Sequence, residues 1–256
     1  MSKKDNNKLK EEYYKTFENC VDYIQIYDNA LSKNECLLLI DLFEKFYKKG
    51  LTSKGKTSAH FHLDENNIEN IKSKNSNDIY LNQLKTKDKE TKNLVSKLYK
   101  KLNYYISDYI VKVGLINPNF AGTGIEFFKK TYMKYKKTPP EHINDGYHLQ
   151  EVCLRKYDKK VGGYHKMHTD INHRTLSRVA AGVLYLNTVK SGGETKFPIL
   201  GRKVKPIAGR YVVFPPYYTH MHYGEIAKSN DRYIIATHVR HSNVEINLIN
   251  KEKGKE

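Results

Sequence analysis

The stretch His168-Thr169-Asp170 decides the fold and chemistry that this sequence predicts. His222 follows 52 residues after Asp170, and Arg232 lies ten residues beyond His222. Side chains two apart on a β-strand project from the same face, so we expect His168 and Asp170 to point inward together. With His222 they would supply two imidazoles and one carboxylate, which is a ligand set for a divalent metal ion.

The third ligand has to be chosen among several histidines of the second half, namely His173, His220, His222, His238 and His241. His222 is favoured because Tyr223-Gly224 follows it and because Arg232 can lie on a neighbouring antiparallel strand, after a turn through residues 228–230. His220 shares the face of His222 if the strand is regular. It therefore stays open as a residue that lines the site or replaces the ligand.

Two histidines and one carboxylate on one side of a metal, with the other positions open, form the facial triad of non-haem Fe(II) oxygenases. An arginine just beyond the second histidine can hold the far carboxylate of a dicarboxylic co-substrate, which indicates 2-oxoglutarate. A second motif with ligand chemistry, His60-Phe61-His62-Leu63-Asp64, has no partner motif downstream. We interpret it as a solvated loop.

The order of expected elements is helices first and strands second. Residues 21–27 predict a first strand, Ser32 with Glu35 forms a capping box for a helix that Gly50 ends, and an apolar stripe over residues 94–113 predicts a second helix that ends at Gly114. Residues 54–84 are polar and weakly patterned, so they predict a variable loop, a candidate lid. Four later strands are expected at Leu149–Tyr157, Val179–Leu186, Tyr211–Phe214 and Tyr233–Val239.

Composition predicts one soluble, intracellular domain. The chain has 256 residues, no Pro/Gly/Ser-rich linker and no N-terminal apolar run, so we expect neither a signal peptide nor a membrane span and a cytoplasmic location. Three scattered cysteines are too few for a disulfide framework. The formal net charge of +17 is spread along the sequence, which favours a solvated surface and leaves association with an anionic partner open.

The run from Tyr157 to His238 resembles the prolyl 4-hydroxylase-like branch of the 2-oxoglutarate and Fe(II)-dependent dioxygenases. The matching residues, in order, are Tyr157, Gly162-Gly163, His168-Thr169-Asp170, Arg178, Leu184-Tyr185-Leu186-Asn187, Gly192-Gly193-Glu194-Thr195, Phe197, Pro206, Gly209, Phe214, His222-Tyr223-Gly224 and Arg232-Tyr233. Residues 23–46 also resemble the entry to that domain.

The resemblance implies an α+β fold with a double-stranded β-helix core, a cupin-like jelly roll buttressed by N-terminal helices. We expect a flexible basic N-terminus at residues 1–20, a single dioxygenase domain at 21–243 and a charged tail at 244–256. Within the domain, helical support would span 32–114 and the catalytic jelly roll about 149–240.

By matched position, the resemblance assigns iron binding to His168, Asp170 and His222 and the grip on 2-oxoglutarate to Arg232. Tyr157 and Thr195 resemble hydroxyl-bearing residues that help to hold the co-substrate. The reaction implied is hydroxylation of an unactivated C–H bond with O2, releasing succinate and CO2, with ascorbate as a candidate reductant.

The branch implies a peptide or protein substrate containing proline. Two other substrates stay open, namely alkylated nucleic acid, which an oxidative demethylase would take and a basic surface would favour, and a free amino acid or small metabolite. A jelly-roll binding protein without catalysis would predict a broken triad or a missing basic anchor, and the sequence has neither defect. The oligomeric state is not indicated by the sequence.

Overall fold

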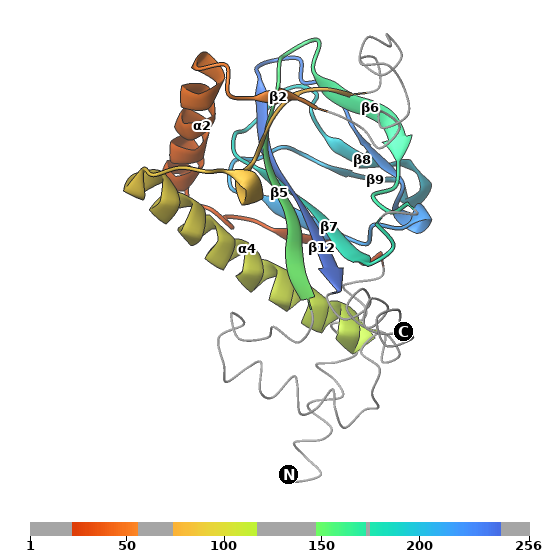
Figure 1. Cartoon of the computed structure of the whole chain (residues 1–256). Helices are drawn as coiled ribbons and strands as arrows, with labels where there is room; N and C mark the ends of the chain where they lie inside the picture. The colour runs from red at the N-terminus through yellow and green to blue at the C-terminus, as the bar shows by residue number, and fades with distance from the viewer. Residues whose placement is uncertain (1–21, 56–73, 117–146, 173–174, 242–256) are drawn as a thin grey trace, which may run out of the picture.

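Two antiparallel β-sheets face each other and enclose the inner core (Figure 1). The computed structural model describes residues 22–55, 74–116, 147–172 and 175–241. The larger sheet has the order β1 (Gln25–Tyr27), β10 (Tyr211–Phe214), β7 (Arg178–Tyr185), β12 (Arg232–His241), β5 (Tyr147–Tyr157), β4 (Asn77–Tyr80) and β2 (Ser53–Lys54). The smaller has the order β3 (Lys74–Asn75), β6 (Gly163–His168), β11 (His222–Gly224), β8 (Thr195–Phe197) and β9 (Arg202–Val204). This arrangement is the expected α+β, jelly-roll architecture.

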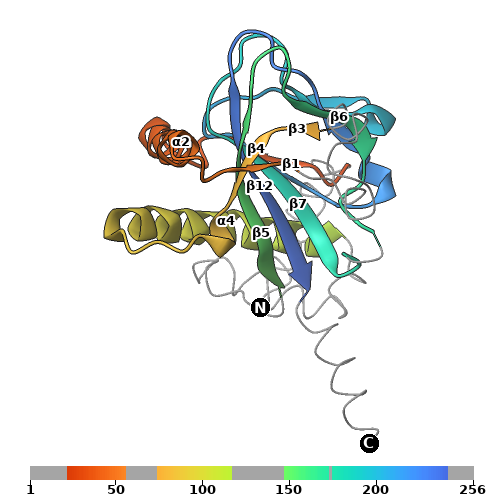
Figure 2. The same ribbon diagram turned by 45° about the horizontal axis from the view of Figure 1, so that its top comes forward.

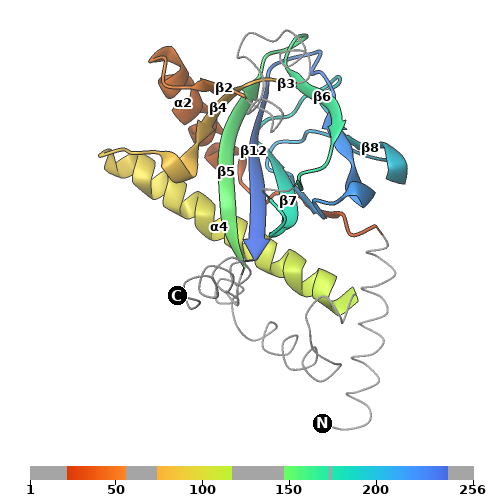
Figure 3. The ribbon, with the colours of Figure 1, turned by 45° about the vertical axis from the view of Figure 1, so that its right-hand side comes forward.

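Two helices, α2 (Lys33–Lys48) and α4 (Lys89–Ile116), lie on the outer face of the larger sheet (Figures 2 and 3). Their apolar stripes pack against outward side chains of the central strands, in a cluster that includes Leu39, Phe43, Leu98, Leu102, Val152, Leu154 and Ile235. Burial of this apolar surface fixes the sheet from behind. Three short 3-10 helices complete the described elements, namely η2 (Leu81–Gln83), η4 (Pro198–Leu200) and η5 (Tyr218–His220).

Strand alternation selects which side chains face the space between the sheets. On β12, Ile235 and Val239 belong to the outer cluster, whereas Ile234 and Ala236 belong to the inner one. A period of two therefore directs Arg232 and His238 inward as well. On β5 the same rule sends Val152 and Leu154 outward, and the odd-numbered residues from 151 to 157 inward.

The predicted start of the first helix is confirmed in detail. Ser32 Oγ accepts a hydrogen bond from the Glu35 backbone N–H, and the Glu35 carboxylate accepts one from the Ser32 backbone N–H. The helix ends at Lys48, and Gly50 then adopts a left-handed φ of 67°. The second helix does not end at Gly114, because it continues to Ile116.

The expectation of a weakly anchored loop at 54–84 is wrong for the part that the structure describes. There β3 pairs with β6 in the smaller sheet and β4 pairs with β5 in the larger sheet. Lys74, Ser76, Asn77 and Asp78 are buried. Polar residues usually indicate an exposed loop, but these are buried because hydrogen bonds and ion pairs compensate for the loss of water. Residues 56–73, which include the His60–Asp64 motif, lie outside the described residues, as do 1–20 and 244–256.

The four strands expected in the second half are all present, with ends shifted by zero to two residues. The short strands β6, β8, β9 and β11 are not among these four, and they form most of the smaller sheet. In the described ranges, neither helix carries an apolar stretch that would suffice to cross a bilayer.

Candidate metal centre and co-substrate pocket

His168, Asp170 and His222 lie close together at the edge of the smaller sheet. β11 pairs with β6 so that His222 lies directly opposite His168. β6 ends at His168, and Asp170 lies in the segment that follows, where its backbone N–H donates to the carbonyl of Pro216 at 3.1 Å. The two residues therefore do not share a strand face as we expected. Nevertheless one ligand atom each from His168, Asp170 and His222 lies within 4.8 Å of the others.

Backbone carbonyls fix the orientation of both imidazoles. The Nδ1 atom of His168 lies 2.9 Å from the carbonyl oxygen of Lys166, and that of His222 lies 3.1 Å from the carbonyl oxygen of His220. A carbonyl only accepts, so each Nδ1 carries a proton and Nε2 is the ring nitrogen left for a metal. These Nε2 atoms lie 3.9 Å and 3.6 Å from the Asp170 carboxylate oxygens.

The protonation states suit a metal. Burial, helped by the nearby His222, lowers the pKa of His168 to about 4 and outweighs the opposing effect of Asp170. Burial raises the pKa of Asp170, but His222 and His238 outweigh it and hold that pKa far below its usual range. Near neutral pH the site thus presents a neutral His168 imidazole and an ionised carboxylate. A divalent cation between these facing acceptors would satisfy all of them, so the residues fit a metal of the kind that such triads hold.

Aromatic rings pack around the two histidines. The Tyr164 ring stacks on His168 with centroids 3.7 Å apart, and the Phe214 ring meets His222 edge-on at 4.7 Å. Such contacts restrict the imidazole rotamers and exclude water from one side of the triad. Tyr164, Phe214 and the triad line one cavity of about 480 Å³.

Arg232 lies in the same cavity and is 2% exposed. Its Nη1 donates to the carbonyl of Gly193 at 2.6 Å, while its buried Nε has no hydrogen-bond partner among the described residues. We expected Arg232 on a strand paired with that of His222, and this is wrong, because β11 and β12 belong to different sheets. The two side chains meet because the sheets face each other across the cavity.

Tyr157 and Thr195, the two further candidates for holding the co-substrate, also line this cavity. Tyr157 lies beneath the Arg232 guanidinium, and the hydroxyl groups of Thr195 and Tyr185 form a hydrogen bond at 2.6 Å. His220 does not join the triad. It ends η5, where its Nε2 lies 2.7 Å from the carbonyl oxygen of Asp22 and its Nδ1 lies 2.9 Å from Thr219 Oγ1. His173 lies outside the described residues.

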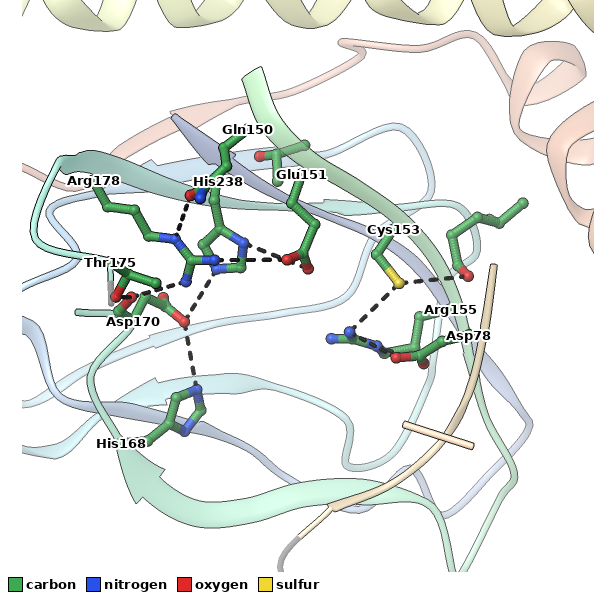
Figure 4. Close-up of polar contacts among 12 residues, drawn as sticks. Asp78, Gln150, Glu151, Cys153, Arg155, His168, Asp170, Thr175, Arg178 and His238 are labelled. Atoms are coloured by element: carbon green, nitrogen blue, oxygen red, sulfur yellow. Dashed lines mark hydrogen bonds and ion pairs between the residues drawn. The ribbon is translucent and has the colours of Figure 1, made fainter. Parts of the chain in front are cut away.

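A polar network beside the triad was missed as such by the sequence reasoning (Figure 4). His238 Nε2 lies 3.3 Å from Asp170 Oδ1, and His238 Nδ1 lies 3.6 Å from Glu151 Oε1. Burial lowers the pKa of His238, but the two carboxylates outweigh it and raise that pKa overall. Arg178 lies next to them, with its Nη2 3.6 Å from Glu151 and its Nη1 donating to the Asp170 backbone carbonyl at 2.9 Å.

A second buried cluster forms the cavity wall farther along β5. Arg155 donates from Nε and Nη2 to the two oxygens of Asp78 at 2.8 and 2.9 Å, and Lys74 and Ser76 contact the same carboxylate. Burial raises the pKa of Asp78, yet Arg155 and Lys74 lower it to about 2 overall. The alternation of inward residues on β5 and β12 is the sequence signal that could have located both networks.

The fold and the site together define a class, that of jelly-roll proteins with two histidines and one carboxylate converging on a buried cavity. Residues 152–240 match the family model described as 2OG-Fe(II) oxygenase superfamily. This matched part of the chain carries the triad and Arg232, and the architecture agrees with the match to this superfamily of Fe(II)- and 2-oxoglutarate-dependent enzymes.

Solved structures have the same architecture at low sequence identity. A prolyl hydroxylase from Trichoplax adhaerens, in complex with a hypoxia inducible factor oxygen degradation domain peptide fragment, is 15% identical, with 94% of each chain covered and a TM-score of 0.58. A prolyl-4-hydroxylase from Pseudomonas putida is 12% identical, with 90% of this chain and all of that chain covered (100%) and a TM-score of 0.54. No curated protein matches the sequence.

Proposed function

We propose that this protein is an Fe(II)- and 2-oxoglutarate-dependent hydroxylase that acts on a peptidyl residue, most specifically proline. The observation that carries the proposal is the convergence of His168, Asp170, His222 and Arg232 on one cavity, although they come from different sheets and segments. A protein that kept the fold only for binding would have no reason to retain all four.

In this proposal each side chain has a distinct task. His168, Asp170 and His222 hold the iron through two imidazole nitrogens and one carboxylate. When bound, Fe(II) with 2-oxoglutarate and O2 supplies the chemistry that hydroxylates an unactivated C–H bond and releases succinate and CO2. Arg232 binds the distal carboxylate of 2-oxoglutarate, and its unpartnered Nε supports that role, because a buried donor without an acceptor is costly.

Tyr157 and Thr195 would complete the co-substrate end of the cavity. The Tyr157 ring supports the guanidinium from one face, and Thr195 places a hydroxyl group on the wall of the cavity. Both are buried, so they can exclude water from the co-substrate as well as contact it.

Support for a peptide substrate comes from the surface around residues 170–172 and 175–178. Leu176 and Tyr218 are 71% and 75% exposed, and the Tyr217 hydroxyl donates to the backbone carbonyl of Arg178 at 3.4 Å, beside cavity-lining Thr175. Exposed apolar and aromatic side chains beside a cavity suit an extended, proline-containing chain. The Trichoplax adhaerens neighbour was solved with a peptide fragment, which favours the same substrate class here.

The deciding experiment measures succinate from purified protein reconstituted anaerobically with Fe(II) and then given 2-oxoglutarate, ascorbate and O2. Parallel reactions contain proline-rich peptides, free amino acids, methylated oligonucleotides or no substrate. We expect substrate-dependent succinate with peptides and a gain of one oxygen atom in their mass. Coupled turnover with oligonucleotides alone, which the net charge of +17 would favour, would replace the peptide proposal with an oxidative demethylase.

A further inference from the structure

His238 is the inward-facing residue of β12 that lies opposite Glu151 in the β5–β12 ladder. Its two ring nitrogens face two different carboxylates: Nε2 lies 3.3 Å from Asp170 Oδ1, and Nδ1, which has no hydrogen-bond partner among the described residues, lies 3.6 Å from Glu151 Oε1 (Figure 4). The side chain is 13% exposed, so solvent does not compete strongly for these contacts. His238 thus joins a proposed metal ligand to a carboxylate on a rigid central strand.

Arg178 completes this network from the neighbouring strand β7. Its Nε donates to Gln150 Oε1 at 2.8 Å, its Nη1 donates to the Asp170 backbone carbonyl at 2.9 Å, and its Nη2 lies 3.6 Å from Glu151. All three guanidinium nitrogens are therefore engaged. Arg178 fixes the backbone of Asp170, whereas His238 contacts its side chain.

His238 does not serve as a fourth metal ligand in this geometry. Among the described residues, the group that could hold an ion contains His168, Asp170 and His222 and does not include His238. His168 and His222 each direct Nδ1 to a backbone carbonyl and leave Nε2 for a metal, whereas both ring nitrogens of His238 face carboxylates. Asp170 Oδ2 lies 3.6 Å from His222 Nε2, and Oδ1, the oxygen that His238 contacts, lies 3.9 Å from His168 Nε2.

We propose that His238 is a positioning residue for the metal centre, which contacts Asp170 Oδ1 and so fixes the orientation of that carboxylate towards His168 and His222. Glu151 faces the other ring nitrogen of His238, and Arg178 holds the Asp170 backbone. The inference rests on the proposed function insofar as the triad binds a metal. A carboxylate held in one orientation would present its oxygens to a metal without first having to reorient. Partners that orient metal ligands typically change metal affinity or activity about 10–100-fold when removed.

The test titrates the full-length protein with Co(II) under anaerobic conditions without 2-oxoglutarate, and follows the visible absorption of the bound ion together with its Kd. The variants are His238→Leu, His238→Gln and Glu151→Gln, with His241→Gln as the matched control three residues farther along β12. The glutamine amide can donate from about the position of Nε2, so His238→Gln tests whether donation itself matters. Thermal melting of each variant without metal reports whether the fold is intact.

We expect His238→Leu to weaken Co(II) binding by about 10-fold or more and to change the absorption spectrum, with His238→Gln and His241→Gln close to wild type. Glu151→Gln should cause a smaller loss in the same direction. If His238 merely reduced the negative charge around Asp170, its removal would instead tighten binding of a cation. Tighter binding, or an unchanged Kd and spectrum in His238→Leu, would overturn the proposal.

Two further outcomes are decisive as well. If His238→Gln were as impaired as His238→Leu, packing and not hydrogen-bond donation would be the role of His238, and the proposal would fail. If His238→Leu did not fold, an unchanged Kd and spectrum in Glu151→Gln would overturn the network, and a weakened Kd would support it. None of these readouts requires turnover, so a failed hydroxylation assay would count against the proposed function without deciding this inference.

Discussion

Arg232 lies across the face of Tyr157, with the guanidinium carbon 4.3 Å from the centre of the ring. The two residues are direct partners in the β5–β12 ladder, and both are 2% exposed. Cross-strand pairing therefore aligns the guanidinium before any ligand arrives, and cation–π contact in a desolvated place contributes about 2 kcal/mol or more. The proposed anchor for 2-oxoglutarate thus belongs to the larger sheet, whereas the histidines of the triad belong to the smaller one.

We predict that Arg232→Met raises the KM for 2-oxoglutarate by about 10–100-fold, because a charge-assisted hydrogen bond contributes roughly 1.5–3 kcal/mol. Arg232→Lys should give an intermediate KM, since an ammonium group cannot form the planar fork. Steady-state succinate assays at varied 2-oxoglutarate measure both effects. Co(II) affinity without co-substrate is the control and should not change; an unchanged KM would remove Arg232 from the co-substrate site.

Gly224 gives a steric test of the same anchor. A Cβ atom added there would lie 2.8 Å from Arg232 Nη2, so the guanidinium would have to shift. We predict that Gly224→Ala raises the KM for 2-oxoglutarate several-fold and leaves the Kd of Co(II) unchanged. Gly201→Ala, where no atom lies within 4 Å of the added Cβ, controls for general destabilisation. Equal KM values in the two variants would contradict the prediction.

The sequence was sufficient to select four residues, His168, Asp170, His222 and Arg232, that the structure places at one cavity. The predicted strand positions of Asp170 and Arg232 relative to the two histidines were wrong. Asp170 lies beyond the end of its strand, and Arg232 faces His222 across two sheets instead of along one hairpin. Both errors concern pairing between distant segments, which local patterns do not encode.

The buried polar residues escaped notice for a different reason. Asp78 and Lys74 fall in a stretch rich in Asn, Lys and Ser, where burial is not the expected state of a charged side chain. Their burial depends on Arg155, 77 positions from Asp78 in the sequence. Only the register of β4 against β5, which places Asp78 opposite Arg155, makes this pairing visible.

Asp78 is predicted to be a major contributor to stability. Asp78→Asn would remove the charged partner that Arg155 has in the interior, and breaking such a pair costs about 3–5 kcal/mol. Urea unfolding at pH 7 measures this loss. Asp41→Asn, at an exposed position of α2, is the matched control. A loss no larger than that of the control would show that the cluster is energetically neutral.

The depressed pKa of Asp78 also predicts that the stabilisation by this residue depends on pH. Because Arg155 and Lys74 outweigh burial and depress the pKa of Asp78 to about 2, the folded state favours the ionised form. The stabilisation is present above the ordinary pKa near 4 and is lost as pH falls towards 2. The difference in free energy of unfolding between wild type and Asp78→Asn should therefore shrink between pH 4 and pH 2. A constant difference over that range would contradict the depressed pKa.

The alternative between His220 and His222 is resolved by a matched pair of variants. His222→Gln should abolish succinate production and weaken Co(II) binding by at least about 10-fold, because a neutral amide replaces an imidazole ligand. His220→Gln should retain both, since the group that orients His222 is the backbone carbonyl of residue 220, which this substitution keeps. Loss of the contacts from His220 to Asp22 and Thr219 should appear only as a lower Tm. If His220→Gln lost Co(II) and His222→Gln kept it, the assignment of the third ligand would be wrong, and the strand pairing of His222 with His168 would have a purely structural role.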